Sequence, residues 1–489
     1  MGEIVKERHP MNLGKVNVTE VINSAKELLE KEKGVSPALE SVCETLLTIV
    51  SMLVDRLKLN SSNSSLPPAA DPNRKKKSRS KSDKKPGGQP GRTGTTLEPV
   101  PNPDKIIPLK IEKDQLPEGQ YKEVGYEARQ VVEIEISRVV TEYRAQVLED
   151  ASGNRHTASF PSTITRPIQY GQSVKSHAVY LSQFQLLPYD RLRDYFSSEL
   201  KIPVSAGSLF NFNQEAYEKL EGFEELVKAK LCESPLIHTD ETGINVNGKR
   251  KWLHTASNLL WTHLFPHDKR GCDAMNETGI LPKFRGVMVH DNWAPYYTYE
   301  ECDHALCNAH HLRELEGVIL RENFKWAKRM QDLLKKMNEA VNETEDSKLS
   351  KESAAAFRKQ YKKILEDGDV ETPPPQPLPG TKKRGRLKKT KSRNLLERMR
   401  HREKDILRFL DVSTVPFTNN LGENDIRMTK VQQKISGCFK AMGGARIFCR
   451  TRSYLLSARK HGILPTDALT TLFKGALPDV FYEPSNQAE

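Results

Sequence analysis

The chain has 489 residues and a formal net charge of +12, and it is long enough to bury a sizeable core. It holds no apolar run near the ~20 residues of a membrane helix, no signal-peptide core at its first residues and no disulfide-framework spacing among its seven cysteines. These features exclude a membrane-spanning protein and a disulfide-stapled secreted domain, and they favour a reduced, cytoplasmic protein.

The net positive charge comes from two tracts of the chain. Residues 73–92 hold nine Lys/Arg and one Asp, residues 381–393 hold eight Lys/Arg and no acid, and the remainder sums to −4. Basic arms on a near-neutral body favour a polyanion such as DNA as partner. The alternative for a lone tract is a solvated linker.

Residues 1–60 are predicted to be an N-terminal helical or coiled-coil segment. Its apolar a/d seam extends over little more than two heptads and consists of Val42, Leu46, Ile49 and Leu53. Such a seam indicates either a short dimerising coil or a helix docked on its own domain. Residues 61–103 are basic, rich in Gly and Pro, and predicted to be a disordered arm. In this arm, Lys85 and Arg92 flank a Gly/Pro-rich segment whose backbone could lie along DNA phosphates or in a minor groove. The alternative is a plain linker.

Residues 104–165 alternate in polarity, above all over 129–136 and 138–147, which predicts a small antiparallel β module. Residues 166–230 are predicted to be helical. One helix is expected over 188–200 and a second after the capping residue Ser205. This spacing suits a DNA-binding helix-turn-helix or a plain helical hairpin.

The pattern over residues 231–311 predicts a mixed β-sheet. Strands are predicted up to Asp240, over 243–246, 251–256, 259–265 and 287–290, and briefly at 304–307, with a hairpin turn at Asn247-Gly248 and a helix from about Ala309. This order matches an α/β core of the ribonuclease-H-like type. Residues 312–415 are predicted to be a helical insertion with a basic, Pro-rich tract, and residues 416–489 to be the C-terminal helices of the core.

Three acids are the candidate catalytic and metal-binding residues. Asp240 and Asp291 each end an apolar strand-like run, where the alternatives are a turn former or a helix cap. Glu423 shares a helix face with Asn420 and Arg427. One interpretation is that Glu423 is a metal ligand and that Asn420 and Arg427 bind the substrate phosphate. The other is that Glu423 is a first-turn acid, favoured by the helix dipole and paired with Arg427.

Two other groups of residues carry side chains that can bind metals. Glu241 follows Asp240 directly and should point to the opposite strand face, so it is not predicted to be a ligand. The C-x4-C-x2-H-H spacing of Cys302, Cys307, His310 and His311 fits no common zinc finger, and the cysteines also suit small apolar positions. Either histidine could instead contact a phosphate.

Several motifs in this order resemble transposases of the insertion sequence 66 family, a branch of the DDE transposases. The motifs are Asn60–Pro68 after the N-terminal coil, Lys85–Gly91, His238–Thr242, Val289–Asp291, Cys307–Arg313, Thr418–Arg427 and Gly443–Arg446. The resemblance implies a ribonuclease-H-like catalytic domain with Asp240, Asp291 and Glu423 as its acid triad. His310 and Arg313 then join Asn420, Arg427, Lys85 and Arg92 as candidate DNA contacts.

The chain departs from the family in two places. Such proteins usually carry a cysteine-rich zinc module after the Gly-Pro arm, whereas residues 104–160 hold no cysteine, which argues against zinc there. Leu421-Gly422 stands where small pairs such as Ala-Ala are common.

The expected function is cleavage of DNA at transposon ends and strand transfer into target DNA. Two Mg²⁺ or Mn²⁺ ions would activate the attacking oxygen and stabilise the leaving 3′-oxygen, with Asp240 bridging both ions. The expected partners are transposon-end and target DNA, further copies of the chain and accessory transposition proteins, in the cytoplasm or nucleoid of a prokaryote. The alternatives are a nuclease of the same fold that does not join DNA, and a DNA-binding protein with an inactive core.

Overall fold

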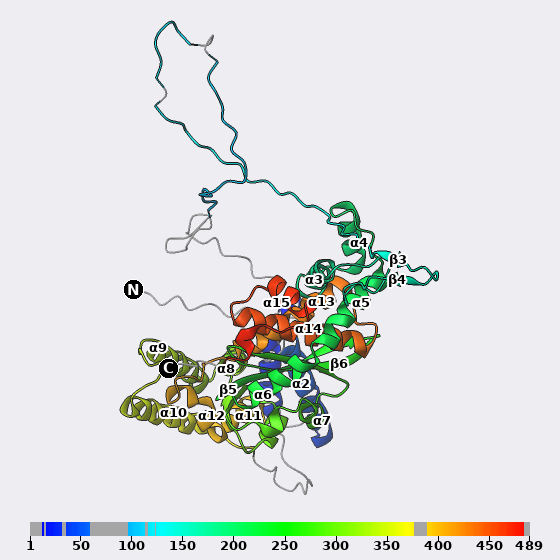
Figure 1. Ribbon diagram of the computed structural model, residues 1–489. Helices are drawn as coiled ribbons and strands as arrows, with labels where there is room; N and C mark the ends of the chain where they lie inside the picture. Colours follow the sequence, from blue (N-terminus) through cyan, green and yellow to red (C-terminus); the bar gives the residue numbers. More distant parts are fainter. Residues whose placement is uncertain are drawn as a thin grey trace. The chain divides into compact units, whose positions relative to one another are not determined.

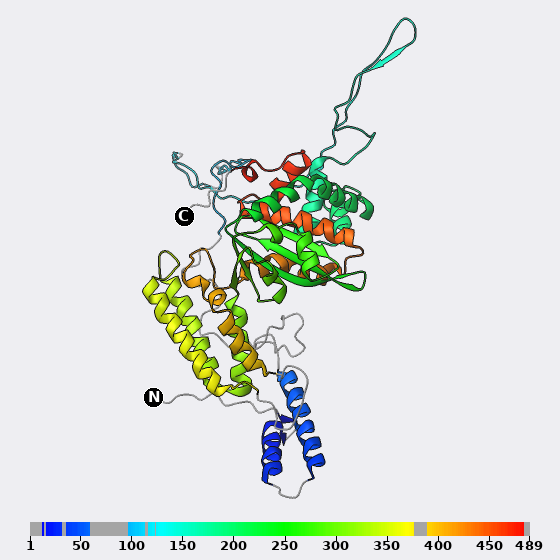
Figure 2. The same cartoon turned by 90° about the horizontal axis from the view of Figure 1, so that it is seen from below.

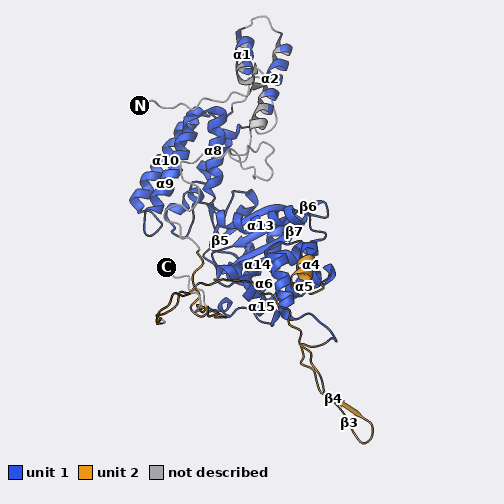
Figure 3. Ribbon diagram, turned by 90° about the horizontal axis from the view of Figure 1, so that it is seen from above, with its two compact units in different colours: residues 1–74, 166–193, 204–489 blue, residues 75–165, 194–203 orange. Residues whose placement is uncertain are grey.

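The computed structural model describes residues 12–13, 16–31, 36–58, 96–112, 116–122, 124–375 and 389–483. The chain divides into two compact units (Figure 3). One comprises residues 1–74, 166–193 and 204–489, and the other residues 75–165 and 194–203. Among the described residues, no helix combines the length and apolarity needed to cross a bilayer.

The N-terminal segment of the first unit holds two helices that lie side by side (Figure 2). Short strands β1 (Asn12–Leu13) and β2 (Val16–Asn17) precede α1 (Val18–Lys31), and α2 (Pro37–Lys58) follows. Pro37 opens α2, a position where its missing N–H is tolerated. The four apolar residues of the predicted seam are 47% to 56% exposed, so a coil with a second copy stays a prediction.

Helices also fill the segment before the sheet. They are α3 (Gln172–Val179), the π-helical turn η2 (Tyr180–Phe184), α4 (Tyr189–Ser198), α5 (Ala206–Lys219) and α6 (Glu221–Cys232). The predicted helices at 188–200 and after Ser205 are confirmed, and the Ser205 hydroxyl accepts the Ser208 N–H at 3.0 Å. The helix-turn-helix function of α4 and α5 stays a prediction.

Among its described residues, the second unit contains one hairpin, β3 (Val147–Glu149) and β4 (Arg155–Thr157). Its turn is held by Asp150, whose carboxylate accepts the N–H groups of Ser152 and Asn154, both at 2.9 Å. The predicted strand over 129–136 and most of that over 138–147 do not form. Their alternating apolar side chains are exposed, Ile134 at 87%, because the described residues offer no surface that would bury them.

A five-stranded sheet forms the centre of the first unit (Figure 1). Its strands are β5 (Leu236–Val246), β6 (Lys249–Ser257), β7 (Thr262–His267), β8 (Val287–His290) and β9 (Asp303–Leu306). Their order is β7-β6-β5-β8-β9, with β5 to β7 antiparallel and β8 and β9 parallel to β5. This topology is compatible with a ribonuclease-H-like core. The hairpin turn is confirmed by positive φ angles at Asn247 (48°) and Gly248 (75°).

Short helices connect the strands and long helices cover them. The connections are α7 (Cys272–Glu277), η3 (Leu281–Lys283) and η4 (Ala294–Thr298), and the C-terminal helices are α13 (Asn420–Ser436), α14 (Met442–Lys460), α15 (Pro465–Phe473) and η6 (Asp479–Phe481). One core cluster joins β5, β6 and β7 to α13 and α14 through residues such as Leu253, Leu264, Ile426 and Phe448.

The predicted helical insertion shares a core with the sheet. It comprises α8 (Asn308–Glu322), α9 (Lys325–Asn342), α10 (Lys351–Glu371), α11 (Lys391–His401), α12 (Glu403–Ile406) and η5 (Arg408–Leu410). Trp326 of α9 and Leu396 of α11 belong to the same buried cluster as Val289 of β8 and Leu306 of β9. The insertion is therefore part of the hydrophobic support of β8 and β9.

The two basic tracts fall mostly outside the described residues. Lys85, Arg92 and residues 381–388 are among those outside. The described end of the second tract is ion-paired within the fold, where Arg393 binds Asp369 at 2.7 Å and Glu397 at 2.9 Å, and Lys389 binds Glu397. Arg393 thus links α11 to α10, whereas Lys389 pairs with α11 itself, and both cations already have acidic partners.

Candidate active site

Asp240 and Asp291 lie at the same level on neighbouring strands. The parallel pairing of β5 with β8 ends at His238 and Val289, and each acid lies two residues further along its chain. The prediction that Asp240 ends a strand is wrong, because β5 continues to Val246 and Asp240 still pairs with Thr255 of β6. Both acids therefore lie just beyond the last β5–β8 pair, where they are half-buried.

Glu423 reaches the same place because α13 runs along β5. At its start, the Asn419 amide donates to the Thr239 carbonyl at 2.8 Å and its oxygen lies 2.8 Å from His238 Nδ1. An amide oxygen only accepts, so Nδ1 of His238 carries the proton. At its end, Phe439 exchanges backbone hydrogen bonds with Asn245 and Asn247. The helix is thereby fixed at both ends of β5, with Glu423 in its first turn.

Asn419 is a site residue that the sequence prediction missed. It is buried, and besides β5 it contacts the N-terminus of α8, because its N–H lies 3.1 Å from Cys307 Sγ. The predicted residue, Asn420, is exposed. The two asparagines are adjacent and chemically identical, so the choice between them depends on which one faces β5.

The three acids influence one another electrostatically. Burial raises the pKa of Asp240 well above its usual range, and the charges of Glu241, Asp291 and Glu423 raise it further. Burial also raises the pKa of Glu423, with Arg313 opposing and Asp291 adding to the effect. Within the described residues, none of the three forms an ion pair. The group is therefore a set of like charges without a bound counter-charge.

The cluster of three carboxylates, Asp240, Asp291 and Glu423, fits hard divalent cations. Its donors are all oxygens, the ligands that Mg²⁺ and Mn²⁺ prefer. Glu423 Oε1 is buried and has no hydrogen-bond partner, a situation that a bound cation would relieve.

Glu241 has an arginine and a tyrosine as partners and helps to hold Asp291 in place. Its carboxylate accepts from Arg270 Nε at 3.0 Å and from the Tyr296 hydroxyl at 2.5 Å. The Arg270 guanidinium stacks between the rings of Trp252, 4.8 Å away, and Trp293, 4.1 Å away. The backbone N–H of Trp293 in turn donates to Asp291 Oδ1 at 3.0 Å, so the network ties the Asp291 turn to β5 and β6.

Two buried histidines shape the same turn. The N–H of Asn292, which has a positive φ of 70°, donates to His290 Nδ1 at 3.2 Å. His290 Nε2 therefore carries the proton and donates to His304 Nδ1 at 3.1 Å, and His304 Nε2 donates to the Tyr299 carbonyl at 3.2 Å. Burial holds the pKa of His290 well below its usual range, which keeps this neutral arrangement.

The predicted DNA contacts divide by position. Arg427 is exposed on α13 and makes no ion pair with Glu423 in the described part of the chain, which removes the alternative reading of Glu423 as its partner. His310 and Arg313 are half-buried on α8 beside the acids. Burial lowers the pKa of His310 to about 4, and the Arg313 charge contributes to this.

The four Cys and His residues do not form one zinc site. Cys302 donates to the Tyr299 carbonyl at 3.3 Å, and His311 is buried with its Nδ1 3.3 Å from Asn308 Oδ1. Only Cys307 and His310 come together, and they do so beside Glu423. Burial raises the pKa of the Cys307 thiol to about 11.

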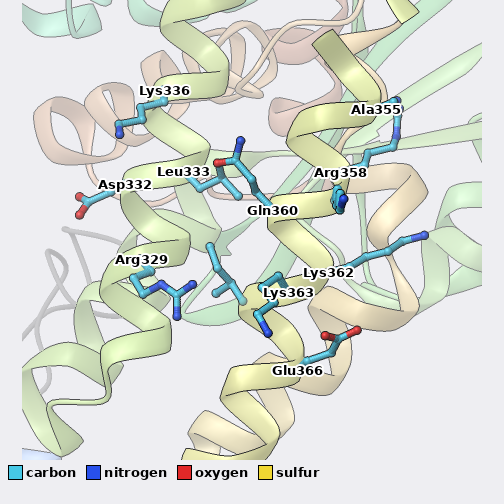
Figure 4. Close-up of a pocket in the computed structure, with 12 residues that line it drawn as sticks. Arg329, Asp332, Leu333, Lys336, Ala355, Arg358, Gln360, Lys362, Lys363 and Glu366 are labelled. Carbon is cyan, nitrogen blue, oxygen red and sulfur yellow. The ribbon is translucent and has the colours of Figure 1, made fainter. Parts of the chain in front are cut away.

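A groove on the helical insertion lies apart from these residues. It has a volume of about 990 Å³ between α9 and α10, and Figure 4 shows cations from both helices around it. Several of these cations have acidic partners: Arg329 binds Asp367 at 2.5 Å, and Lys362 lies 3.8 Å from Glu403. The groove is not lined by Asp240, Asp291 or Glu423.

The comparison with known families agrees with the geometry. The model of the family described as "Transposase IS66 family" matches residues 167–447, more than half of the chain. The chain belongs to the IS66 transposase family. The matched residues of this IS66-family protein include all three acids, Asn419 and the whole sheet. A search of curated proteins found no match. Family membership supports a transposase-type enzyme with DNA as partner and with divalent metal use.

Proposed function

We propose that this IS66-family protein cleaves DNA at transposon ends and transfers the freed 3′ ends into target DNA, with Asp240, Asp291 and Glu423 as the catalytic acids. The observation that supports this most is a set of three carboxylates, from β5, the end of β8 and α13, that lack ion-pair partners among the described residues and in which Asp240 and Glu423 have raised pKa values. Such an arrangement is unfavourable in a metal-free protein, which fits a site built for cations.

The three carboxylates would hold two Mg²⁺ or Mn²⁺ ions. When bound, the ions would supply activation of the attacking oxygen and neutralisation of the charge on the leaving 3′-oxygen. The protein's part is to fix the carboxylates in place. Asn419 fixes Glu423 against β5, and the Glu241–Arg270–Trp293 network fixes Asp291.

The surrounding cations and amides suit DNA phosphates. Arg313 is half-buried beside Glu423 and forms no ion pair among the described residues, so its charge would be left for a phosphate oxygen. Asn420 and Arg427 are exposed on α13 and would follow the DNA backbone away from the acids. His310 completes this group, and Lys85 and Arg92 would add sequence-independent grip. Recognition of the DNA ends is assigned to residues 60–230.

The test is incubation of the purified protein with labelled transposon-end DNA, a target plasmid and Mg²⁺. We expect cleavage at the ends and joined products, and loss of both in Asp240→Ala, Asp291→Ala and Glu423→Ala while binding of end DNA persists. The matched control is Asp346→Ala, an exposed acid in the turn between α9 and α10, which should keep full activity.

The same assay separates the other candidate functions. Cleavage without joined products would identify a nuclease of the same fold. Binding without cleavage in Mg²⁺ or Mn²⁺ would identify an inactive DNA-binding protein. Cleavage by Asp291→Ala would refute the proposed catalytic role of that residue.

A further inference from the structure

A second set of possible metal ligands, with different chemistry, lies at the edge of the three-carboxylate cluster. Cys307 caps the N-terminus of α8, His310 lies in the first turn of that helix, and Glu423 lies in the first turn of α13. The sulfur, an imidazole nitrogen and a carboxylate oxygen of these residues all lie within 4.8 Å of one another. A thiol, an imidazole and a carboxylate at such distances are the donors of a zinc-type site.

Two of these side chains have buried polar atoms without partners. His310 Nδ1 and Glu423 Oε1 are both buried and form no hydrogen bond. Leaving such atoms unpaired is unfavourable, and a cation between them would accept both lone pairs. The neighbouring His311 does not share this feature, since its Nδ1 lies 3.3 Å from Asn308 Oδ1.

The sulfur is placed as an acceptor. The Asn419 N–H points to Cys307 Sγ at 3.1 Å, and the backbone N–H groups of Ala309 and His310 also act on the thiol at the start of α8. These N–H donors oppose the burial that raises the pKa of the Cys307 thiol to about 11. Cys302, five residues earlier, differs because its Sγ donates to the Tyr299 carbonyl.

We propose that Cys307, His310 and Glu423 bind a thiophilic divalent ion of the Zn²⁺ class, with the thiol proton released to solvent. The inference rests on the proposed function in one respect, because Glu423 is shared with the acid triad. Three protein ligands leave a fourth position open. A bound zinc-class ion would withdraw Glu423 from the hard-cation site, so Zn²⁺ would inhibit Mg²⁺-dependent cleavage.

The test is titration of the full metal-free chain with Co²⁺, followed by absorption spectroscopy. Thiolate ligation gives a sulfur-to-cobalt charge-transfer band in the near ultraviolet, which oxygen and nitrogen ligands do not give. We expect this band in the wild type, its bleaching by one equivalent of Zn²⁺, and its loss in Cys307→Ser. The band should weaken in His310→Gln and persist in the matched control Cys302→Ser.

The outcomes are separable. A missing band in the wild type, or a band that persists in a folded Cys307→Ser or vanishes in Cys302→Ser, would overturn the proposal. Should Cys307→Ser fail to fold by circular dichroism, His310→Gln decides, and an unchanged band there counts against the site. Failure of the proposed function would appear as absent cleavage in Mg²⁺ with the Co²⁺ spectrum intact, whereas failure of this inference leaves Mg²⁺-dependent cleavage intact.

Discussion

The side chain of Asp240 combines burial with three neighbouring carboxylates, all of which raise its pKa. The pKa values of Glu241 and Glu423 are raised as well, first of all by burial. At these three carboxyl groups, the folded, metal-free protein therefore binds protons more tightly than the unfolded chain. Its stability is greatest at low pH as far as these groups are concerned, and decreases as pH rises from about 4 through their raised folded-state pKa values.

Replacement of Asp240 by Asn should therefore stabilise the metal-free protein at neutral pH. Asn keeps an oxygen for the Glu241 N–H, which lies 2.9 Å from Asp240 Oδ1, and removes the buried charge. We expect a higher melting temperature than wild type at pH 7, a difference that shrinks toward pH 4, and a smaller stabilisation by Mg²⁺. Thermal melts across pH, with and without Mg²⁺, measure all three, and an equal Mg²⁺ response in both proteins would contradict the assigned ligand.

Asn419 should matter for both stability and cleavage. Asn419→Ala removes buried hydrogen bonds to His238 and Thr239 and leaves their polar atoms unpaired, at a cost of about 2–3 kcal/mol. Cleavage should fall further than DNA binding, because Glu423 loses its anchor. Urea unfolding and end-cleavage rates test this. Asn420→Ala, at the exposed neighbour, should leave the unfolding midpoint unchanged.

Among the elements, the pairing of β5 with β8 sets the spacing of the first two acids. Gly286 makes this pairing close, because a Cβ there would lie 2.4 Å from the Pro235 carbonyl oxygen. The Val287 N–H, next in the chain, donates to that same oxygen at 2.8 Å. A side chain at residue 286 would force β8, and with it Asp291, away from β5.

Gly286→Ala should consequently destabilise the protein by about 2–4 kcal/mol and reduce cleavage. The matched control is Gly443→Ala in α14, where an added Cβ meets nothing within 4 Å. That control should be neutral or slightly stabilising, because Ala favours helix over Gly. Chemical denaturation of the two variants compares them directly, and equal stabilities would show that β8 can move without penalty.

Features set by local chemistry were predictable from sequence. The Ser205 cap, the Asn247-Gly248 turn and the bounds of β8 each depend on a few adjacent residues. Features that depend on distant partners were not. The alternation at 129–136 does not reveal that no described part of the chain covers it, and nothing near Asp240 shows that β6 continues beside it. Glu423 could be predicted from its motif, whereas Asn419 required the packing of α13 on β5.

At the scale of the whole molecule, some cations of the basic tracts are ion-paired within the fold, and we propose that others bind DNA. Lys389 and Arg393 are occupied by Glu397 and Asp369 inside the helical insertion. The cations of residues 73–92 and 381–388 remain as the proposed electrostatic contacts to DNA. Each phosphate contact they make contributes a slope of about −0.9 to the dependence of log K on log salt.

Substitution of the Lys and Arg residues of 73–92 by Gln should therefore weaken DNA binding at low salt and flatten its salt dependence. Fluorescence anisotropy at several salt concentrations measures the slope. Lys389→Gln should leave the slope unchanged and lower the melting temperature instead, because its partner is Glu397. An unchanged slope after the first substitution would show that residues 73–92 are a linker.

The position of α13 along β5 has a consequence during synthesis of the protein. A ribosome completes β5 and β8 long before it reaches α13, so an emerging chain displays Asp240 and Asp291 without Glu423. On the proposed mechanism, a product of aborted translation that ends before α13 would hold the basic arm and two acids, and it could bind chromosomal DNA but not cut it. The host genome is then exposed to nicking only by chains whose last helices have docked.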